Sequence, residues 1–172
     1  MHLRDATLDD TESILRLNHV SVRFLSPLTA QRLSWLHGMA SYHRVVEWQG
    51  QVLAFLLAFG PGAAYDSPNY QWFARHFEAF LYVDRIVVDP AAQGQGLAAR
   101  LYQDLFAFAR ETAAPRITLE IDSDPPNPVS NRFHARYGFR EVGSQWVAGG
   151  TKRVSLQELP LDKDPDRRVP AA

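Results

Sequence analysis

The stretch that decides the fold, residues 81–98, reads Leu-Tyr-Val-Asp-Arg-Ile-Val-Val-Asp-Pro-Ala-Ala-Gln-Gly-Gln-Gly-Leu-Ala. Its first eight residues form a largely apolar run that predicts a buried strand, and Asp89-Pro90 ends it. Apolar residues then recur at helical spacing over residues 97–110. The turn between strand and helix contains Gly94 and Gly96, so several backbone N–H groups and the positive end of the helix dipole can point to one spot. This strand-turn-helix unit predicts an anion cradle, most naturally for phosphate.

The turn matches neither of the two common nucleotide-binding motifs. A dinucleotide-binding fingerprint needs a third glycine, and this turn continues into Ala99 instead. A P-loop needs Gly-Lys-Ser/Thr, and the turn contains no lysine. The glycines therefore indicate another phosphate-bearing ligand, or a turn that needs glycine for its backbone alone.

Helical and β patterns alternate on both sides of this unit. The upstream patterns predict a short first strand, a helix at 7–17, a helix after Pro27, a hairpin at 44–59 and a long loop at 60–70. The downstream patterns predict a strand at 116–121, a helix at 129–137 that ends at Gly138, and strands at 141–147 and 153–159. This order predicts an α/β (α+β) fold with helices on the faces of a sheet.

Composition places the chain among globular proteins. Its 172 residues are 46% hydrophobic and 22% charged, which predicts one domain over residues 1–160 and a flexible tail over 161–172. A formal net charge of -1 offers no electrostatic footprint for nucleic acid or an anionic membrane. Without cysteine or a His-x-x-x-His pair, we expect no disulfide framework and no metal site, and the default location is cytoplasmic.

The chain contains the turn Gln93-Gly94-Gln95-Gly96-Leu97-Ala98, and later Asn127 followed after eleven residues by Gly138-Phe139. These two motifs resemble those of the GNAT superfamily of acyl-CoA-dependent N-acyltransferases. The resemblance extends over roughly residues 1–160. It implies a mixed, largely antiparallel sheet of about six to seven strands, flanked by helices. In that family two central parallel strands splay apart, and here these would be residues 81–88 and 116–121.

The resemblance implies acetyl-CoA (coenzyme A) as the acetyl donor. Its pyrophosphate would lie on the backbone amides of Gln93, Gly94, Gln95, Gly96, Leu97 and Ala98. Its pantetheine arm would pair like an extra strand with Ile86, Val87 and Val88, which is β-augmentation by a small molecule. Asn127 would bond the pantetheine region, and the alternative for this residue is an Asx turn before Pro128.

Acetyl transfer to an amine needs a base for the amine, stabilisation of the oxyanion and a proton for the departing thiolate. Glu120 resembles the strand carboxylate that acts as the base in protein N-terminal acetyltransferases of the superfamily, and its alternative is a solvated strand-face carboxylate. Asp84 is the rival base, and its alternative is a structural ion pair with Arg85.

His134 occupies the position at which the family usually has a tyrosine, four residues before Gly138. We predict that it returns a proton to the CoA thiolate, helped by Glu120, which would raise the pKa of the imidazole. Packing on the helix face against the sheet is the alternative for this histidine.

The aromatic segment at residues 65–73 is the candidate wall of the acceptor site, through Tyr65, Tyr70, Trp72 and Phe73, although such residues can equally cap the core. The expected acceptor is a primary amine of a small molecule or peptide, acetylated by direct attack in a ternary complex. The alternatives are an acyl-CoA-binding regulatory module with little turnover, and a sheet-edge dimerisation domain without a ligand. As partners we expect the amine acceptor, no nucleic acid and no membrane, with a homodimer left open.

Overall fold

The structure is a computed structural model that describes residues 1–23 and 25–161. The strands are β1 (His2–Asp5), β2 (Tyr42–Trp48), β3 (Gln51–Phe59), β4 (Leu81–Val88), β5 (Arg116–Asp124), β6 (Arg140–Val147) and β7 (Lys152–Pro160). The α-helices are α1 (Thr11–Val20), α2 (Ala30–Met39), α3 (Pro68–His76), α4 (Leu97–Glu111) and α5 (Pro128–Tyr137). Among the described residues there are also three short 3-10 helices, at Leu8–Asp10, Pro90–Ala92 and Ala148–Gly150.

The strands form one seven-stranded sheet in the order β1-β2-β3-β4-β5-β7-β6. Every neighbouring pair is antiparallel except β4 and β5, which are parallel. The predicted mixed, largely antiparallel sheet of six to seven strands is therefore confirmed.

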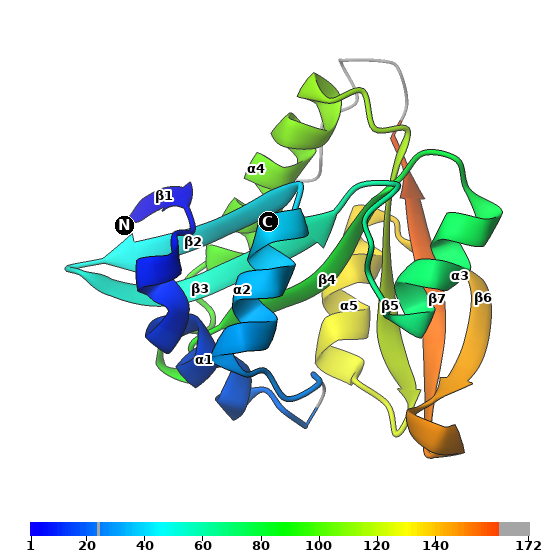
Figure 1. The fold of residues 1–172 in the computed structure, drawn as a ribbon, viewed down its shortest axis with the longest axis horizontal. Coiled ribbons are helices and arrows are strands. Elements are labelled where there is room, and N and C mark those ends of the chain that lie inside the picture. The colour runs from blue at the N-terminus through cyan, green and yellow to red at the C-terminus, as the bar shows by residue number, and fades with distance from the viewer. Residues whose placement is uncertain (24, 162–172) are drawn as a thin grey trace.

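The parallel pair at the centre of the sheet is short. β4 and β5 pair only through Leu81 with Ile117 and Tyr82 with Thr118, although each strand continues for several residues more. The two strands therefore separate after Tyr82, as Figure 1 shows, and the predicted splay is confirmed.

A β-bulge lies in β4 at the point where the strands separate. Leu57 of β3 pairs with Arg85, whereas the next residue, Ala58, pairs with Val83, so Asp84 is the extra residue. Side chains of a regular strand alternate between the two faces of a sheet. The bulge interrupts this alternation, and the side chains of both Asp84 and Arg85 lie on the face covered by α1 and the loop before α3.

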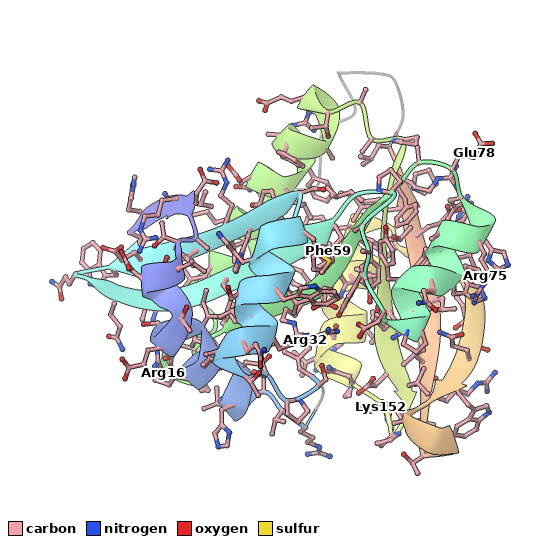
Figure 2. All side chains as sticks on the ribbon, in the orientation of Figure 1. Arg16, Arg32, Phe59, Arg75, Glu78 and Lys152 are labelled. Atoms are coloured by element: carbon pink, nitrogen blue, oxygen red, sulfur yellow. The ribbon has the colours of Figure 1, made fainter. Side chains whose placement is uncertain are left out.

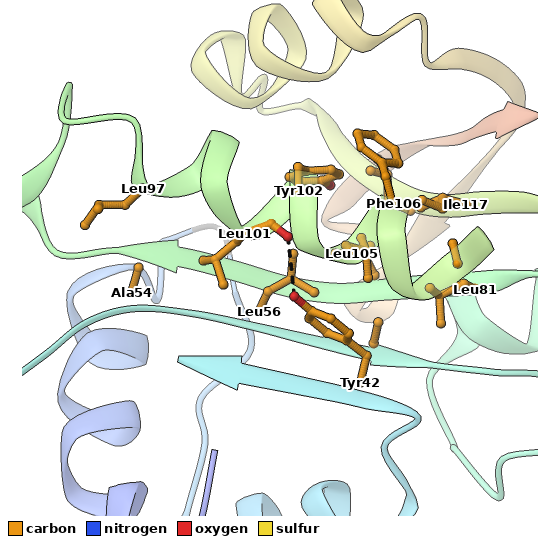
Figure 3. Packing of buried hydrophobic residues seen from close by; sticks show 14 of the residues in the cluster. Tyr42, Ala54, Leu56, Leu81, Leu97, Leu101, Tyr102, Leu105, Phe106 and Ile117 are labelled. Carbon is orange, nitrogen blue, oxygen red and sulfur yellow. Dashed lines mark hydrogen bonds between the residues drawn. The ribbon is translucent and has the colours of Figure 1, made fainter. Parts of the chain in front are cut away.

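Helices cover both faces of the sheet, with α1, α2 and α3 on one face and α4 and α5 on the other (Figure 1). Under α4 and α5, Leu101, Leu105 and Phe106 pack against apolar residues of β2 to β5. Figure 3 shows this cluster, in which the Tyr42 hydroxyl also donates a 3.4 Å hydrogen bond to the Leu101 carbonyl. On the other face, one cluster lies beneath α2 and α3 and a second beneath α1 and α2.

The prediction of a continuous loop over residues 60–70 is wrong at its end, because α3 begins at Pro68. The Ser67 side chain accepts a hydrogen bond from the Tyr70 N–H, and Pro68 occupies the first helical turn, where its missing N–H costs nothing. The Ser-Pro pair that begins the helix is also a turn signal, so the segment was predicted as a loop.

The two ends of the chain also differ in detail from the predictions. The helix predicted at 7–17 divides into the 3-10 turn Leu8–Asp10 and α1. Leu161, placed at the start of the predicted tail, donates its N–H to the Pro115 carbonyl, and residues 162–172 lie outside the described residues. Within the described ranges, no helix is long and apolar enough to span a membrane.

Candidate active site

The glycine turn at the end of β4 has the geometry of an anion cradle. Gly94 and Gly96 both have φ +78°, in the left-handed region that favours glycine, and Gly96 caps the start of α4. A Cβ atom built on either glycine would meet nothing within 4 Å, so the space in front of the turn is open. The first N–H groups of α4 have no partner inside the helix and are free to bind an anion. The residues present therefore fit a pyrophosphate.

The edge of β4 beyond the splay is open to an extended ligand. Ile86, Val87 and Val88 pair with β3 on one side. On the other side, the ladder with β5 ends at Tyr82 and Thr118. Backbone N–H and C=O groups on that edge can pair with an extended amide-bearing chain, as the predicted contact with pantetheine requires.

Asn127 caps α5. Its side chain accepts a 3.1 Å hydrogen bond from the Ser130 N–H, and its own N–H donates to the Asp122 carbonyl. The capping role of the side chain is thus established, while the contact with pantetheine stays a prediction.

Glu120 lies on β5 at the splay. The Tyr82 hydroxyl of β4 donates a 2.7 Å hydrogen bond to its carboxylate, and the residue is half-buried. Burial raises the pKa of Glu120 to about 7, and the charge of Asp84 adds to the shift, whereas hydrogen bonds from Tyr82 and Asn69 oppose it. A carboxyl group with this pKa can accept a proton near neutral pH.

Asp84 is held by two partners. One of its oxygens accepts a 2.5 Å hydrogen bond from the Tyr65 hydroxyl, and the other accepts one of 2.6 Å from Arg85 Nε. Its side chain is 5% exposed and that of Arg85 is 4% exposed, so this is a buried ion pair. The ion-pair alternative for Asp84 is confirmed, and its role as the base stays a prediction.

His134 lies among the aromatic side chains between α4 and α5, on the sheet face opposite Tyr65 and Tyr82. Its Nε2 is 2.7 Å from the Tyr102 hydroxyl and its Nδ1 is 2.8 Å from the Ser130 carbonyl. A carbonyl can only accept, so Nδ1 carries a proton and the neutral ring's Nε2 accepts from Tyr102.

Burial lowers the pKa of His134 to about 4. The expectation that Glu120 would raise this pKa is therefore wrong, because burial dominates and the only opposing contact is with the Ser130 backbone. Proton donation by His134 itself stays a prediction.

The predicted acceptor-site aromatics have different surroundings. Tyr65 is 7% exposed and lies next to Asp84, whereas the Tyr70 hydroxyl bonds the Gly60 carbonyl and the Ala63 N–H. Phe73 is fully buried, and Trp72 stacks on His76. The core-capping alternative thus describes Tyr70 and Phe73, and Tyr65 is the member that reaches the carboxylates.

Three polar side chains near the carboxylates were not named as site residues from the sequence: Asn69, Gln145 and Arg32. Asn69 of α3 bonds both Glu120 and the Gln145 side chain of β6, which is 2.7 Å away. The Arg32 guanidinium of α2 lies 4.2 Å from the centre of the Trp35 ring and forms an ion pair with Asp66. Figure 2 places Arg32 near the middle of the molecule, between α2 and the central strands. Asn69 and Asp66 lie inside the aromatic segment, but only the fold brings Arg32 and Gln145 to it.

The splayed sheet, glycine turn and strand carboxylate are the features of an acyltransferase fold. Residues 8–139 match the acetyltransferase (GNAT) family, and the chain belongs to this family.

Curated relatives match part of the chain. Acetyltransferase Atu2258 of Agrobacterium fabrum is 38% identical over 65 residues, which are 38% of this chain and 44% of that protein. Phosphinothricin N-acetyltransferase of Streptomyces coelicolor is 38% identical over 64 residues, 37% of this chain and 36% of that protein. The chain thus matches less than half of the length of these relatives.

Solved structures match nearly the whole chain. The ribosomal-protein-S18-alanine N-acetyltransferase of Escherichia coli has a TM-score of 0.71 at 15% identity, covering 97% of both chains. Naa20 of Chaetomium thermophilum, in complex with a bisubstrate analogue, has a TM-score of 0.75 at 16% identity, covering 98% of this chain and 91% of that chain. At these identities the likeness establishes the fold alone.

Proposed function

We propose that the protein is an N-acetyltransferase that moves an acetyl group from acetyl-CoA to a primary amine of a small molecule or peptide by direct attack in a ternary complex. The observation that carries the proposal is the position of Glu120, a carboxyl group with a pKa of about 7 at the splay. Family membership supports acetyl transfer.

The chain would hold acetyl-CoA along one continuous path. The backbone amides of residues 93–98 would bind the pyrophosphate, and the open edge of Ile86, Val87 and Val88 would pair with the pantetheine arm. When bound, acetyl-CoA supplies the acetyl thioester.

Glu120 would accept the proton that the amine loses as its nitrogen attacks. The C–N bond forms, the C–S bond breaks, and the sulfur leaves with the bonding electron pair. A base with a pKa near the working pH is partly deprotonated and still takes up a proton readily, so the pKa of Glu120 suits this step.

The proposal is tested by incubating the protein with acetyl-CoA and a panel of amines while measuring the release of free thiol. The panel should contain peptide N-termini and small amines, because the named relatives include a ribosomal-protein-alanine and a phosphinothricin acetyltransferase. Amine-dependent thiol release that Glu120→Gln abolishes, with thermal stabilisation by CoA retained, supports the proposal.

The alternative is an acyl-CoA-binding regulatory module. It is favoured by His134, which stands where the resemblance implies a tyrosine and whose two ring nitrogens are already engaged. Thermal stabilisation by acetyl-CoA without thiol release from any amine of the panel would select this alternative.

A further inference from the structure

A buried chain of polar side chains links the bulge of β4 to the end of α1. Arg85 NH1 donates 2.8 Å to Asn18 Oδ1, and Arg85 NH2 lies 3.4 Å from Ser26 Oγ. Asn18 in turn donates 3.1 Å to the Ser26 carbonyl. Arg85 and Asn18 are 5% and 2% exposed, so the guanidinium is fixed on its far side by α1 and the segment that follows it.

The same guanidinium fixes Asp84, and Asp84 fixes Tyr65. Both carboxylate oxygens of Asp84 are occupied, one by Arg85 and one by the Tyr65 hydroxyl. The carboxylate of Asp84 is thus committed to two side chains, one of which is its ion-pair partner. This arrangement determines where the Tyr65 hydroxyl proton points.

The Tyr65 oxygen retains capacity to accept a hydrogen bond. A phenol has one proton and two acceptor lone pairs. The proton points to Asp84, and Arg85 also bonds the hydroxyl, which leaves one lone pair. Burial and the charge of Asp84 raise the pKa of Tyr65, so the phenol keeps its proton across the neutral range.

Tyr65 and Glu120 lie on the same face of the sheet, and both are close to Tyr82. The Tyr65 ring centre is 6.4 Å from that of Tyr82, whose hydroxyl bonds Glu120. Both residues lie on the sheet face opposite α4, and the charge of Glu120 contributes to the pKa of Tyr65. A carboxylate and a phenolic oxygen, two acceptors of different kinds, therefore lie close to Tyr82 on one face of the sheet.

We propose that Asp84 and Arg85 are positioning residues that hold the Tyr65 oxygen as a second hydrogen-bond acceptor for the attacking amine beside Glu120, making the site selective for primary over secondary amines. This proposal rests on the proposed function. A neutral primary amine has two N–H groups and one lone pair. One N–H gives its proton to Glu120, the other donates to Tyr65, and the lone pair forms the C–N bond while the C–S pair leaves on sulfur.

A secondary amine cannot satisfy both acceptors, because its single N–H goes to Glu120 and the Tyr65 oxygen is left without a donor. A site that hydrogen-bonds a substrate group discriminates against an analogue that lacks the group. We therefore expect the wild type to prefer the primary amine.

The experiment compares the fastest primary amine of the panel with its N-methyl derivative, in the wild type and in Tyr65→Phe. This substitution removes one hydroxyl and leaves the Asp84–Arg85 pair in place. We expect kcat/KM for the primary amine to fall about tenfold, the cost of one hydrogen bond, while kcat/KM for the N-methyl amine stays within about twofold. The affinity for CoA should not change.

The matched control is Tyr42→Phe, which removes a phenol bonded to a carboxylate on the opposite face of the sheet, 2.9 Å from Asp104. Tyr42→Phe should not change the selectivity ratio, which is kcat/KM for the primary amine divided by kcat/KM for its N-methyl derivative. Asp84→Ala, which releases the Tyr65 hydroxyl, should reduce the ratio as Tyr65→Phe does. If Asp84→Ala fails to fold, Tyr65→Phe decides alone.

The proposal is overturned if Tyr65→Phe leaves the ratio unchanged, or if it raises the rate of the N-methyl amine, which would indicate relief of a clash. It is also overturned if Asp84→Ala abolishes turnover while Tyr65→Phe keeps the wild-type ratio, because Asp84 would then be the base. A wild type that acetylates no amine at all contradicts the proposed function itself, a different result from an unchanged ratio in an active enzyme.

Discussion

At Glu120, burial removes water from the charged carboxylate and brings its proton equilibrium close to neutral pH. The ionised form is the one that accepts a proton, so the base is lost as the pH falls below about 7. We expect kcat, measured with both acetyl-CoA and the amine at saturation, to rise about tenfold per pH unit below that value and to level off above it, whereas kcat/KM would also follow the ionisation of the free amine. A pH profile of the initial rate measures this limb.

Two variants make the test specific for Glu120. Glu120→Gln should lower kcat by roughly 10²- to 10⁴-fold, the usual cost of losing a general base. Asp104→Asn removes a carboxylate on the opposite face of the sheet and should leave the acidic limb where it is. A wild-type profile in Glu120→Gln would exclude the residue as the base.

His134 has the environment of a structural residue. His134→Ala leaves a cavity between α4 and α5 and deprives the buried Tyr102 hydroxyl of its acceptor, which should cost roughly 2–4 kcal/mol of folding free energy. We expect kcat to change by no more than a few-fold, measured well below the melting temperature. A loss of roughly 10²-fold or more in a folded variant would instead establish the predicted acid role.

The pH dependence of stability provides a second readout for His134. Its pKa is about 4 in the folded protein and near 6.5 unfolded, so between these values the unfolded chain binds more protons. The contribution of His134 to stability therefore falls as the pH is lowered from 6.5 to 4. In His134→Ala the melting temperature should fall less steeply over this range, and an unchanged slope would contradict the assigned pKa.

Sequence patterns identified the candidate site residues only in part. Glu120 could be named as a candidate base because it lies on the strand beside the expected splay and the resemblance gave it a role. Its partners Tyr82 and Asn69 come from a neighbouring strand and a distant helix, so their contacts depend on the sheet register and on packing. His134 was identified as the residue at the family's usual tyrosine position. Its burial against Tyr102 could not be predicted, because it depends on how α4 and α5 pack.

Among the elements, the turn between β4 and α4 is the most sensitive to substitution. Gly96 adopts φ +78°, where a β-branched residue is strained, and a Cβ there would project into the open space that the proposed pyrophosphate site would use. We expect Gly96→Val to abolish the thermal stabilisation by acetyl-CoA. Differential scanning fluorimetry with and without acetyl-CoA measures the shift.

Gly50 offers a matched control for this prediction. It has the same φ of +78° and open surroundings, but it lies in the turn between β2 and β3. Gly50→Val should lower the melting temperature by a similar amount while keeping the shift with acetyl-CoA. If acetyl-CoA raised the melting temperature equally in both variants and in the wild type, the glycine turn would not be part of the binding site.

Most elements follow from local patterns, and the exceptions have physical causes. The strand predicted at residues 81–88 has those bounds in the structure, because a short apolar run that ends at Asp-Pro predicts a buried strand. α3 was missed because its helical start, Ser67-Pro68, is also a turn signal. The bulge at Asp84 could not be predicted, because it depends on the register against β3.

Viewed as a whole, the molecule has two half-sheets, β1-β2-β3-β4 and β5-β7-β6, joined across the centre by two residue pairs. The resemblance implied this division, whereas the point at which β4 and β5 separate could not be predicted, because it depends on the sheet register. A ligand pairing with the open edge of β4 would replace the missing ladder and connect the two halves.

Acetyl-CoA should therefore stabilise the molecule across the splay. Binding to the folded state alone contributes about 2.7 kcal/mol at a hundredfold excess over Kd, which for a chain of this size corresponds to a rise of roughly 5–10 °C in melting temperature. Hydrogen exchange measured by mass spectrometry should slow at residues 83–88 and 119–124 when acetyl-CoA is added, and residues 42–48 of β2 serve as the internal reference.

The pattern of protection distinguishes a bridging ligand from one bound only at the surface of the turn. A bridging ligand covers the edge of β4 and restrains β5 against it, so both strands must respond together. Protection confined to residues 93–98 would mean that phosphate binding alone stabilises the protein and that the pantetheine arm does not enter the splay. Equal protection of β2, β4 and β5 would mean general stabilisation without a bridge, because β2 lies two strands from the opening.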